Sequence, residues 1–557
     1  MSSKSRLIYI PIGGAGEIGM NMYLYGYGPK GRERFILIDI GVAFPDMETT
    51  PGVDLIIPDI NYVVEKKDRL DAIFITHAHE DHIGALGFLF SKFPVPVYCR
   101  KFTAAIASNK MISTYGDTKK INIMKALPET VKVGNFTVGF IPLSHSIPEA
   151  SALSIKTPIG LLIHTGDLKL DKNPVLGEPF EESVFREIGE KGVLALICDS
   201  TNVFSQHEGR SESTLKEPIT DLLRKETGMV VATTFASNIA RLVTLAESAK
   251  KSGRRILVLG RAMNTMLATA KAVNILKDFP DVVTPLEASE IPRKKLLVLA
   301  TGSQGESRAV SAQLARDKYM DIELKRGDCF LFSSKTIPGN EKSVNKIINM
   351  LVSKGVNVID EDNGKYHVSG HANKPDLKTI HSLIHPLLLI PMHGELRHLR
   401  EHVSLGEKCD LKSVMAPNGS VVEIKKDGSY QISDTIQTGR MLLDGGVLIG
   451  SSDGVIRSRI QLATRGHISV SILIEENQTL LNGVWVKSKG LPDLDNSLAE
   501  LESFIEDSIE AELLELKKKE LDDDEIVESS AQRVVNKICK KEINRRPVTT
   551  FFINRIE

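Results

Sequence analysis

The chain has 557 residues, a formal net charge of −1, 42% hydrophobic residues and 25% charged residues. This length predicts several domains, and the composition is typical of a soluble globular protein. The balanced charge excludes a uniformly basic surface for a polyanion, so positive potential toward such a partner must be confined to a groove.

The N-terminal residues lead directly into a strand-like segment without the apolar core of a secretory signal. No apolar run reaches the ~20 residues that a membrane helix needs. Cys99, Cys198, Cys329, Cys409 and Cys539 are widely spaced and never form a CxxC pair. Because four of the five lie in or beside apolar runs, we expect buried free thiols and a cytoplasmic protein without a membrane segment.

A glycine-rich stretch at residues 13–21 follows the first predicted strand. Its Gly-x-Gly-like pattern suggests dinucleotide binding as one interpretation. The next apolar run, at residues 35–40, follows without the crossover helix that a dinucleotide-binding fold requires. We therefore expect a tight hairpin loop that lines a site.

Residues 77–82 have the sequence HAHEDH, which combines three histidines with two carboxylates. The apolar run at residues 71–76 predicts a buried strand before this cluster, and residues 83–90 predict a helix after it. A polar loop with accidental histidines is a weak alternative, because the whole chain contains only 14 histidines. His77 and His79 alternate whereas Asp81 and His82 are adjacent, so the two pairs are expected to face two neighbouring metal positions.

Later apolar runs also end in polar residues, as α/β scaffolds do when they build one site at a sheet edge. The runs lie at residues 136–141, 161–165, 193–197 and 387–390. The expected ligands are His77, His79 and His145 for one metal and Asp81, His82 and His393 for the other, with Asp167 bridging both. Imidazole and carboxylate without thiolate fit zinc or manganese, and such an ion pair suits hydrolysis of a phosphodiester.

Other polar residues near these strand ends have two interpretations each. Asp199 is expected to orient a ligand histidine, or alternatively to cap a helix. His371, in a Ser-Gly-His turn, is the best candidate for the general acid that protonates a departing 3′ oxygen; the alternative is a structural hydrogen bond. Cys198 is not expected to be a ligand, and His164 is expected to face the core.

Between about residues 204 and 359 the chain alternates between strand-like and helical segments. Its apolar runs, at residues 229–234, 255–259, 295–300 and 329–332, lead into small, hydroxyl-bearing turns. This pattern predicts a parallel sheet, whose helix N-termini suit phosphate. Small residues also simply make tight turns, but with Arg241, Arg261 and Arg308 nearby, phosphate-backbone binding is the favoured interpretation.

After about residue 424 the pattern weakens. Glycines at residues 445–446 and 450–454 predict a hinge or hairpin, and residues 548–553 predict a closing strand. An amphipathic helix is predicted from Leu498, Leu501, Ile505, Ile509 and Leu513. We expect a small α+β module that contains no catalytic constellation.

These motifs resemble those of a known superfamily. The HxHxDH pattern with His145, Asp167 and His393 resembles the metallo-β-lactamase fold. The Asp199-Ser-Thr-Asn stretch, the inserted α/β segment and the turn at His371 resemble its β-CASP nuclease branch. Residues 13–21, 233–238, 301–306 and 337–341 are similar to signatures of the bacterial ribonuclease J family. The resemblance is strong over about residues 7–425.

The resemblance implies an α/β fold: a metallo-β-lactamase αββα sandwich with an inserted β-CASP parallel-sheet domain and a small C-terminal α+β domain. We expect the first part of the metallo-β-lactamase domain at 1–205, the β-CASP domain at 206–360, the return of the first domain at 361–435, a linker at 436–455 and the C-terminal domain at 456–557.

The resemblance also implies an activity. It implies a cytoplasmic ribonuclease of RNA maturation and decay, with 5′-to-3′ exonuclease action favouring 5′-monophosphate ends, and endonuclease action. It implies two Zn²⁺ ions per subunit, with Mn²⁺ or Mg²⁺ as alternatives, homodimers or homotetramers, and partners in an RNA-decay complex. The implied catalytic residues are Asp81, Asp199 and His371, and the implied RNA-binding residues are Ser237, Asn238, His367, Ser369, Gly370 and His371.

Two alternatives stay open. One is a different hydrolase of this superfamily, acting on DNA or on small esters; the inserted domain argues against small esters, and RNA differs from DNA through 2′-OH contacts that a sequence does not show. The other is a non-catalytic RNA-binding scaffold, against which the complete set of seven metal-ligand candidates argues.

Overall fold

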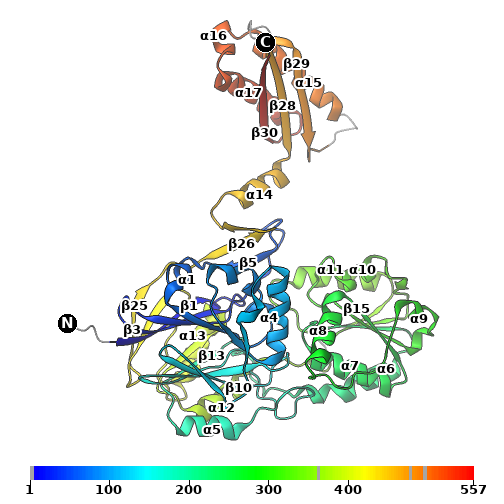
Figure 1. Ribbon diagram of the computed structural model, residues 1–557. Coiled ribbons are helices and arrows are strands. Elements are labelled where there is room, and N and C mark those ends of the chain that lie inside the picture. The colour runs from blue at the N-terminus through cyan, green and yellow to red at the C-terminus, as the bar shows by residue number, and fades with distance from the viewer. Residues whose placement is uncertain (1–4, 361–363, 476–479, 493–497, 557) are drawn as a thin grey trace. The chain divides into compact units, whose positions relative to one another are not determined.

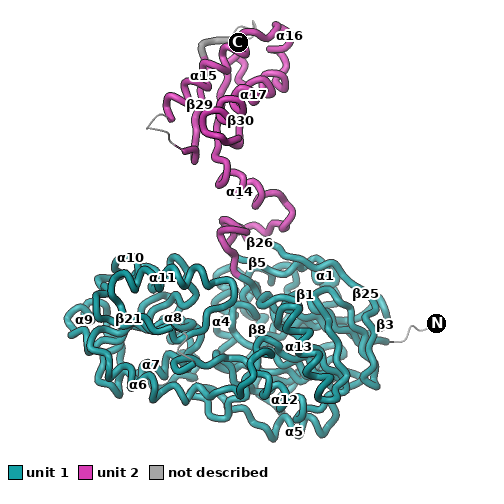
Figure 2. Tube along the Cα trace, turned by 180° about the vertical axis from the view of Figure 1, so that it is seen from behind, with its two compact units in different colours: residues 1–43, 55–441 teal, residues 44–54, 442–557 magenta. Residues whose placement is uncertain are grey.

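The computed structural model describes residues 5–360, 364–475, 480–492 and 498–556 (Figure 1). The chain divides into two compact units, one made of residues 1–43 and 55–441 and the other of residues 44–54 and 442–557 (Figure 2). Within the described ranges, no helix is both long and apolar enough to cross a lipid bilayer.

The first unit contains a sandwich of two sheets. The eight-stranded sheet has the order β25-β24-β1-β3-β4-β6-β7-β8, and the six-stranded sheet has the order β22-β13-β12-β11-β10-β9. The first sheet comprises β1 (Ser5–Gly13), β3 (Met22–Pro29), β4 (Arg34–Ile38), β6 (Leu70–Phe74), β7 (Val97–Cys99), β8 (Ile121–Ile123), β24 (Ser420–Ile424) and β25 (Tyr430–Thr435). The second comprises β9 (Thr130–Val133), β10 (Phe136–Pro142), β11 (Ser151–Thr157), β12 (Gly160–His164), β13 (Ala195–Asp199) and β22 (Leu389–Met392).

Alternation along the strands explains why the two sheets pack face to face. Phe140 of β10 belongs to the core between the sheets, where it meets Phe74 of β6, whereas its neighbour Ile141 points to the opposite face. That opposite face is covered by α5 (Glu182–Glu190), α12 (Lys374–Ile384) and α13 (Leu396–Glu407), whose apolar residues share a core with it. Together with α4 (Lys101–Ser113) against β7 and β8, this arrangement confirms the predicted αββα sandwich.

An α/β domain is inserted between β13 and α12. Its six-stranded sheet has the order β16-β15-β17-β14-β20-β21, and every pairing in it is parallel, as predicted. The strands are β14 (Val230–Thr233), β15 (Arg255–Leu259), β16 (Val282–Val283), β17 (Leu296–Ala300), β20 (Cys329–Phe332) and β21 (Asn357–Ile359). The helices are α6 (Lys216–Lys225), α7 (Ile239–Lys251), α8 (Arg261–Ala272), α9 (Pro285–Glu290), α10 (Val310–Arg316) and α11 (Glu341–Ser353).

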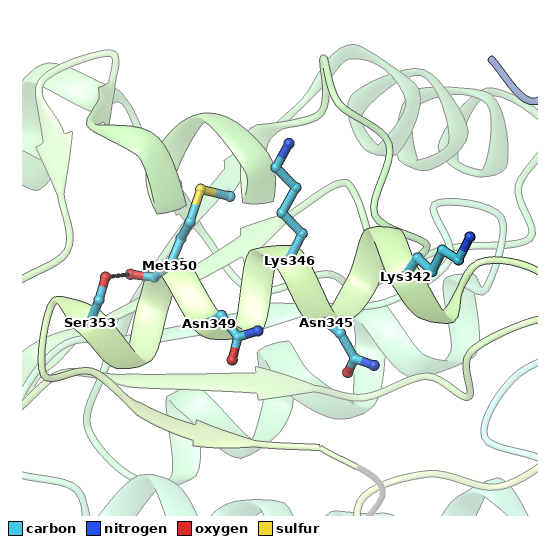
Figure 3. Close-up of a pocket in the computed structure, with 6 residues that line it drawn as sticks. All are labelled: Lys342, Asn345, Lys346, Asn349, Met350 and Ser353. Atoms are coloured by element: carbon cyan, nitrogen blue, oxygen red, sulfur yellow. Dashed lines mark hydrogen bonds between the residues drawn. The ribbon is translucent and has the colours of Figure 1, made fainter. Parts of the chain in front are cut away.

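Helix α11 carries a shallow open groove of about 590 Å³ on its surface (Figure 3). The groove is lined by Lys342, Asn345, Lys346, Asn349, Met350 and Ser353. None of these residues follows a strand end or belongs to the predicted metal site. The groove is therefore not the candidate functional site.

The second unit contains the small α+β module. A hairpin of β26 (Arg440–Asp444) and β27 (Val447–Gly450) falls where glycines predict a hinge or hairpin, and α14 (Val455–Arg465) follows it. The remaining elements are β28 (His467–Glu475), β29 (Leu480–Lys489), α15 (Leu498–Leu514), α16 (Lys518–Leu521), α17 (Asp524–Glu542) and β30 (Val548–Ile556). The predicted amphipathic helix and closing strand are both present. The domain boundaries given above stay predictions.

All five cysteines are free, and four of them are buried. Cys409 is the partly exposed one. The expectation of buried free thiols is thus confirmed for Cys99, Cys198, Cys329 and Cys539.

Candidate metal centre

The HAHEDH cluster follows the buried strand β6, as predicted. The helix differs from the prediction, because α2 (Glu80–Ile83) begins inside the cluster and ends before a separate short helix, α3 (Leu86–Leu89). His79 precedes α2 in an extended conformation, and its carbonyl accepts the N–H groups of His82 and Ile83. The sharp turn separates the two pairs of ligands. His77 and His79 precede the helix, whereas Asp81 and His82 lie on its first turn.

Three histidines and one carboxylate form the first donor set. His79 Nδ1 lies 3.1 Å from His77 Nε2 and 3.1 Å from His145 Nε2. Asp167 Oδ2 lies 3.6 Å from His77 Nε2 and 3.4 Å from His145 Nε2. One ligand atom from each of the four residues falls within 4.8 Å of all the others.

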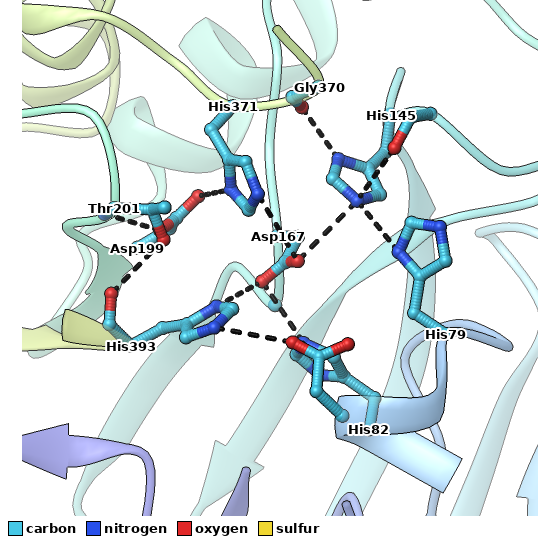
Figure 4. A network of polar contacts seen from close by, with 12 residues as sticks. His79, His82, His145, Asp167, Asp199, Thr201, Gly370, His371 and His393 are labelled. Carbon is cyan, nitrogen blue, oxygen red and sulfur yellow. Dashed lines mark hydrogen bonds and ion pairs between the residues drawn. The ribbon is translucent and has the colours of Figure 1, made fainter. Parts of the chain in front are cut away.

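The second donor set lies beside the first (Figure 4). His82 Nε2 is 3.2 Å from Asp167 Oδ1 and 3.6 Å from Asp81 Oδ2. His393 contributes Nδ1 at 2.6 Å from Asp167 Oδ1, and its Nε2 lies 3.4 Å from Asp81 Oδ2. Asp167 thus presents Oδ1 to one set and Oδ2 to the other, so its carboxylate is the group that both sets share.

The hydrogen bonds behind these histidines fit a divalent cation. His145 donates from Nδ1 to the carbonyl of Gly370 at 2.6 Å, so in the neutral ring the Nε2 lone pair faces the Asp167 carboxylate. His82 likewise directs Nδ1 at Asp39 and Nε2 at Asp167. Two acceptors that face each other repel unless a cation lies between them, and His393 Nε2 is also buried without a hydrogen bond to any part of the chain that the structure describes. The donor set of imidazole and carboxylate therefore suits a divalent metal.

Asp39 supports the second donor set, although no sequence motif marks it. Its Oδ2 lies 2.7 Å from His82 Nδ1 and also accepts a hydrogen bond from Thr76 Oγ1 at 2.8 Å, while Oδ1 accepts from Thr76 N at 2.8 Å. The backbone of Asp39 has φ +60, a conformation that Asp tolerates better than most residues. A carboxylate after a buried strand was the available signal, because the other site residues follow strands in the same way.

The glycine-rich stretch lines the centre, as predicted. It delivers Asn21, whose Nδ2 donates to the carbonyl of Asp81 at 3.1 Å and lies 3.0 Å from His82 Nε2. Tyr23 donates its hydroxyl to Asn21 Oδ1 at 2.7 Å and thereby orients the amide.

His371 and Asp199 form a pair at the edge of the centre. His371 Nδ1 lies 2.8 Å from Asp199 Oδ2, and its Nε2 lies 3.9 Å from Asp167 Oδ2. The other oxygen of Asp199 accepts from the N–H and hydroxyl of Thr201 at 2.9 and 2.7 Å. Asp199 therefore both caps a turn, which does not continue into a helix, and orients a histidine. His371 is 21% exposed in its side chain, whereas the Asp199 side chain is buried, so His371 is accessible to a substrate.

Electrostatics divides the histidines into two groups. Burial lowers the pKa of His145 well below its usual value and that of His79 to about 4, so these two rings are neutral and can bind a metal without releasing a proton. Burial also lowers the pKa of His393, but Asp167 and Asp81 outweigh burial and raise it to about 10. This strong negative field of the carboxylates is the field that attracts a cation.

The predicted RNA-binding residues are found in two places. Ser369 and Gly370 lie at the centre: Ser369 Oγ accepts from Asn202 Nδ2 at 2.8 Å, and Gly370 holds His145. Ser237 and Asn238 lie in the inserted domain, where Asn238 Oδ1 caps α7 by accepting from Arg241 N at 3.0 Å.

The interpretation of Arg241 as a phosphate ligand is wrong. Its side chain is fully buried and makes an ion pair with Glu212. The guanidinium also donates to the carbonyl of Ser333, lies 3.2 Å from His367 Nδ1 and donates to the carbonyl of Val368 at 3.3 Å. Arg241 therefore ties the inserted domain to the segment that carries His371. The helix-start pattern could not reveal this, because it does not show which way the side chain points.

Comparison with known protein families covers most of the chain. Models match for the metallo-beta-lactamase superfamily at residues 16–200, the ribonuclease J beta-CASP domain at 227–351, the Zn-dependent metallo-hydrolase RNA specificity domain at 361–417 and the ribonuclease J C-terminal domain at 454–556.

Among curated proteins, ribonuclease J from Sinorhizobium meliloti is 38% identical over 559 residues, covering 100% of this chain and 98% of the relative. This chain belongs to the ribonuclease J family. Ribonuclease J from Mycolicibacterium smegmatis is 31% identical, over 96% of this chain and 95% of the relative, and that from Thermus thermophilus is 34% identical, over 84% and 82%. The predicted class, a metal-dependent ribonuclease, is thereby confirmed.

A solved structure shares the fold alone. It is a protein of unknown function from Enterococcus faecalis, 18% identical, with a TM-score of 0.51 over 75% of this chain and 100% of that chain.

Proposed function

We propose that the chain hydrolyses RNA phosphodiester bonds with two Zn²⁺ ions, acting as a 5′-to-3′ exonuclease that favours 5′-monophosphate ends and also as an endonuclease. The observation that carries this proposal is the pair of adjacent donor sets that share the Asp167 carboxylate. His77, His79 and His145 would hold one ion, and Asp81, His82 and His393 would hold the other, with Asp167 shared by both sets. Mn²⁺ and Mg²⁺ are the alternatives that the same proposal admits.

Divalent cations bound here supply activation of water and stabilisation of the charge that develops on the scissile phosphate. Asp81 would contribute as a ligand, and its Oδ2 lies 3.4 Å from His393 Nε2. His371 donates a proton from Nε2 to the departing 3′ oxygen, because its Nδ1 is held by Asp199 at 2.8 Å and only Nε2 is free to face the substrate. Asp199 positions this ring and favours its protonated form.

The preference for the 5′ end is supported by hydroxyl groups at the carboxyl edge of the β-CASP sheet. Thr233, Thr234 and Ser334 are buried there, and their hydroxyls have no hydrogen-bond partner among the residues that the structure describes. Such groups suit phosphate oxygens, which accept hydrogen bonds. We assign this edge, with Ser237, Asn238 and His367, to the terminal nucleotide.

The segment between Tyr366 and His371 connects this edge to the metal centre. Ser333 donates its hydroxyl to the carbonyl of Tyr366 at 2.6 Å. Five residues further along the chain, His371 Nε2 lies 3.9 Å from Asp167 Oδ2. Five residues span at most about 17 Å. The terminal nucleotide can therefore be held at one end of the segment while the next phosphodiester bond lies at the other, with Ser369 and Gly370 contacting the RNA between them.

Three further features belong to this proposal. The free cysteines support a reducing, cytoplasmic location. We also propose homodimers or homotetramers and partners in an RNA-decay complex, and membership of the family is the only support for these two features.

The test incubates the zinc-loaded chain with RNA carrying a 5′-monophosphate or a 5′-triphosphate and with DNA of the same sequence. We expect mononucleotides to be released from 5′-monophosphate RNA, more slowly from triphosphate RNA, and internal cleavage of a substrate with a blocked 5′ end. Absence of RNA cleavage with zinc, manganese and magnesium alike would refute the proposal.

Variants separate the roles of the residues. His371→Ala should lower cleavage strongly while the chain retains both metals, as measured by metal analysis of the purified protein. His385→Asn is the control, because His385 is exposed and lies at the end of α12. If His371→Ala cleaved RNA as fast as the unaltered chain, its assignment as the general acid would be wrong.

A further inference from the structure

The C-terminal sheet has one covered face and one open face. Its order is β29-β28-β30, and β28 alternates strictly between buried and partly exposed residues. The buried residues Ile468, Val470, Ile472 and Ile474 share a core with α15 and α17. The side chains at the alternate positions therefore lie on the face that these helices leave uncovered.

Two aromatic side chains stand on the open face. Trp485 of β29 is 54% exposed and Phe552 of β30 is 55% exposed. In the sheet register, Ser471 of β28 is the partner of both residues. Since neighbouring strands lie about 4.8 Å apart, the two aromatic residues are about 10 Å apart, with a small serine between them.

Most groups around the two rings are polar or basic, and Leu473 of β28 and Ile556 of β30 are apolar residues on the same face. Lys487 and Lys489 follow Trp485 at alternate positions of β29, on the same face, and are exposed. Lys487 pairs with Glu502 at 3.0 Å; the Lys487 side chain is 77% exposed and that of Glu502 is 12% exposed. On β30, Asn554 donates from Nδ2 to Ser471 Oγ at 3.2 Å.

We propose that this face binds single-stranded RNA, with bases stacked on Trp485 and Phe552 and with Lys487 and Lys489 along the phosphates. Exposed aromatic rings on a sheet are the platform on which unpaired bases stack, and basic side chains beside them follow the backbone. This inference rests on RNA being the substrate, as proposed above. The site lies in the second unit and the metal centre in the first, so RNA bound at this face would be at a raised effective concentration for the enzyme.

The same features argue against a protein partner. A stable protein interface has a contiguous apolar centre, whereas here the rings are separated by Ser471 and flanked by lysines. Lys487 and Lys489 supply positive charge beside Trp485, while Glu502, Glu506 and Glu510 of α15 accept hydrogen bonds from the backbone of β29. An isolated ring with polar surroundings suits a base, which offers a flat face and hydrogen-bonding edges.

Trp485 supplies its own assay, because it is the only tryptophan in the chain. The metal-loaded full chain is titrated with a phosphorothioate oligouridine of about 12 nucleotides, which resists hydrolysis and matches the footprint of a single-stranded site. We expect quenching of tryptophan emission by the single strand and none by an RNA duplex, whose bases are already stacked. Unchanged emission at saturating RNA, with binding confirmed by anisotropy of a labelled oligonucleotide, would overturn the proposal.

Substitutions on the face provide the second measurement. Phe552→Ala and Trp485→Ala should each weaken binding of the labelled oligonucleotide by about 5- to 160-fold, the range of one base–aromatic stack. Phe504→Ala is the matched control, since Phe504 is 49% exposed but lies on helix α15. Equal affinities for all three variants would contradict the proposal.

Two further outcomes distinguish the explanations. If Phe552→Ala dissociates an oligomer in sedimentation while leaving RNA affinity unchanged, the face is a subunit contact and the proposal fails. If quenching occurs and Phe552→Ala binds the oligonucleotide more weakly, as expected, but the chain cleaves no RNA, the platform stands and only the proposed function fails.

Discussion

Asp39→Asn is the substitution that most directly tests how the metal centre is held. Asp39 accepts from Thr76 N and Thr76 Oγ1 and lies 2.7 Å from His82 Nδ1. An asparagine keeps the size and tolerates the φ +60 backbone, but it removes the charge and replaces one acceptor oxygen by a donor. At least one of the three contacts is lost, so His82 is no longer held with Nε2 toward the metal.

The expected loss of zinc affinity follows from the position of Asp39, which holds the metal ligand His82. Losing such a partner weakens metal binding by about 10- to 100-fold, or about 1.4–2.7 kcal/mol. The metal-free protein is titrated with zinc against a competing indicator, and RNA cleavage is measured over the same zinc range. The midpoint for Asp39→Asn should shift to higher zinc, while cleavage at saturating zinc recovers toward that of the unaltered chain.

The control makes the same chemical change in the same backbone conformation elsewhere. Asp321 has φ +62 and is exposed between β18 (Lys318–Tyr319) and β19 (Ile322–Glu323), so Asp321→Asn should leave the zinc midpoint unchanged. If Asp39→Asn behaved like Asp321→Asn, the reasoning that Asp39 holds His82 for the metal would be refuted.

The remaining predictions concern buried ionisable residues away from the metal centre. Arg241→Met leaves Glu212 buried without its partner and should lower the free energy of unfolding in urea by about 3–5 kcal/mol, whereas the double variant with Glu212→Met should recover much of that loss. Additive effects of the two changes would contradict this. Burial lowers the pKa of His381 from 6.5 to about 4, so between these values the unfolded chain takes up a proton that the folded chain does not. Stability should therefore fall as the pH drops from 6.5 to 4, by up to about 3 kcal/mol, and His381→Leu should remove this part of the slope while His385→Asn keeps it. Equal slopes for both variants in pH-dependent urea unfolding would show that His381 is not the group responsible.

The metal-ligand candidates were predictable because their signals are local. Each ligand lies in or just after a segment whose apolar run predicts a strand, and parallel strands bring their carboxyl ends to one edge. The HAHEDH cluster alone indicates a metal, and the later strand ends supply the rest. Asp39 carried the same kind of signal, but a single aspartate after a strand is too common to be distinguished without its neighbours.

Two sequence predictions were wrong, because the direction of a side chain or the exact start of a helix cannot be read from the sequence pattern. Arg241 stands at a helix start, which suggested phosphate, but its guanidinium turns inward to Glu212, 29 positions away in the chain. Helix α2 begins inside the histidine cluster because His79, which adopts an extended conformation, accepts its first hydrogen bonds, and hydrophobic periodicity does not detect so short a helix.

The sequence by itself determined the chemistry of the centre, the parallel sheet of the insertion and the family, because ligand type and strand periodicity are properties of short segments. Only the tertiary structure decided which atoms face each other: Asp167 between two donor sets, Asp39 behind His82, and Trp485 level with Phe552 across Ser471. These depend on strand register and side-chain direction between residues far apart in the chain, and a shift of one residue in register would move a side chain to the opposite face.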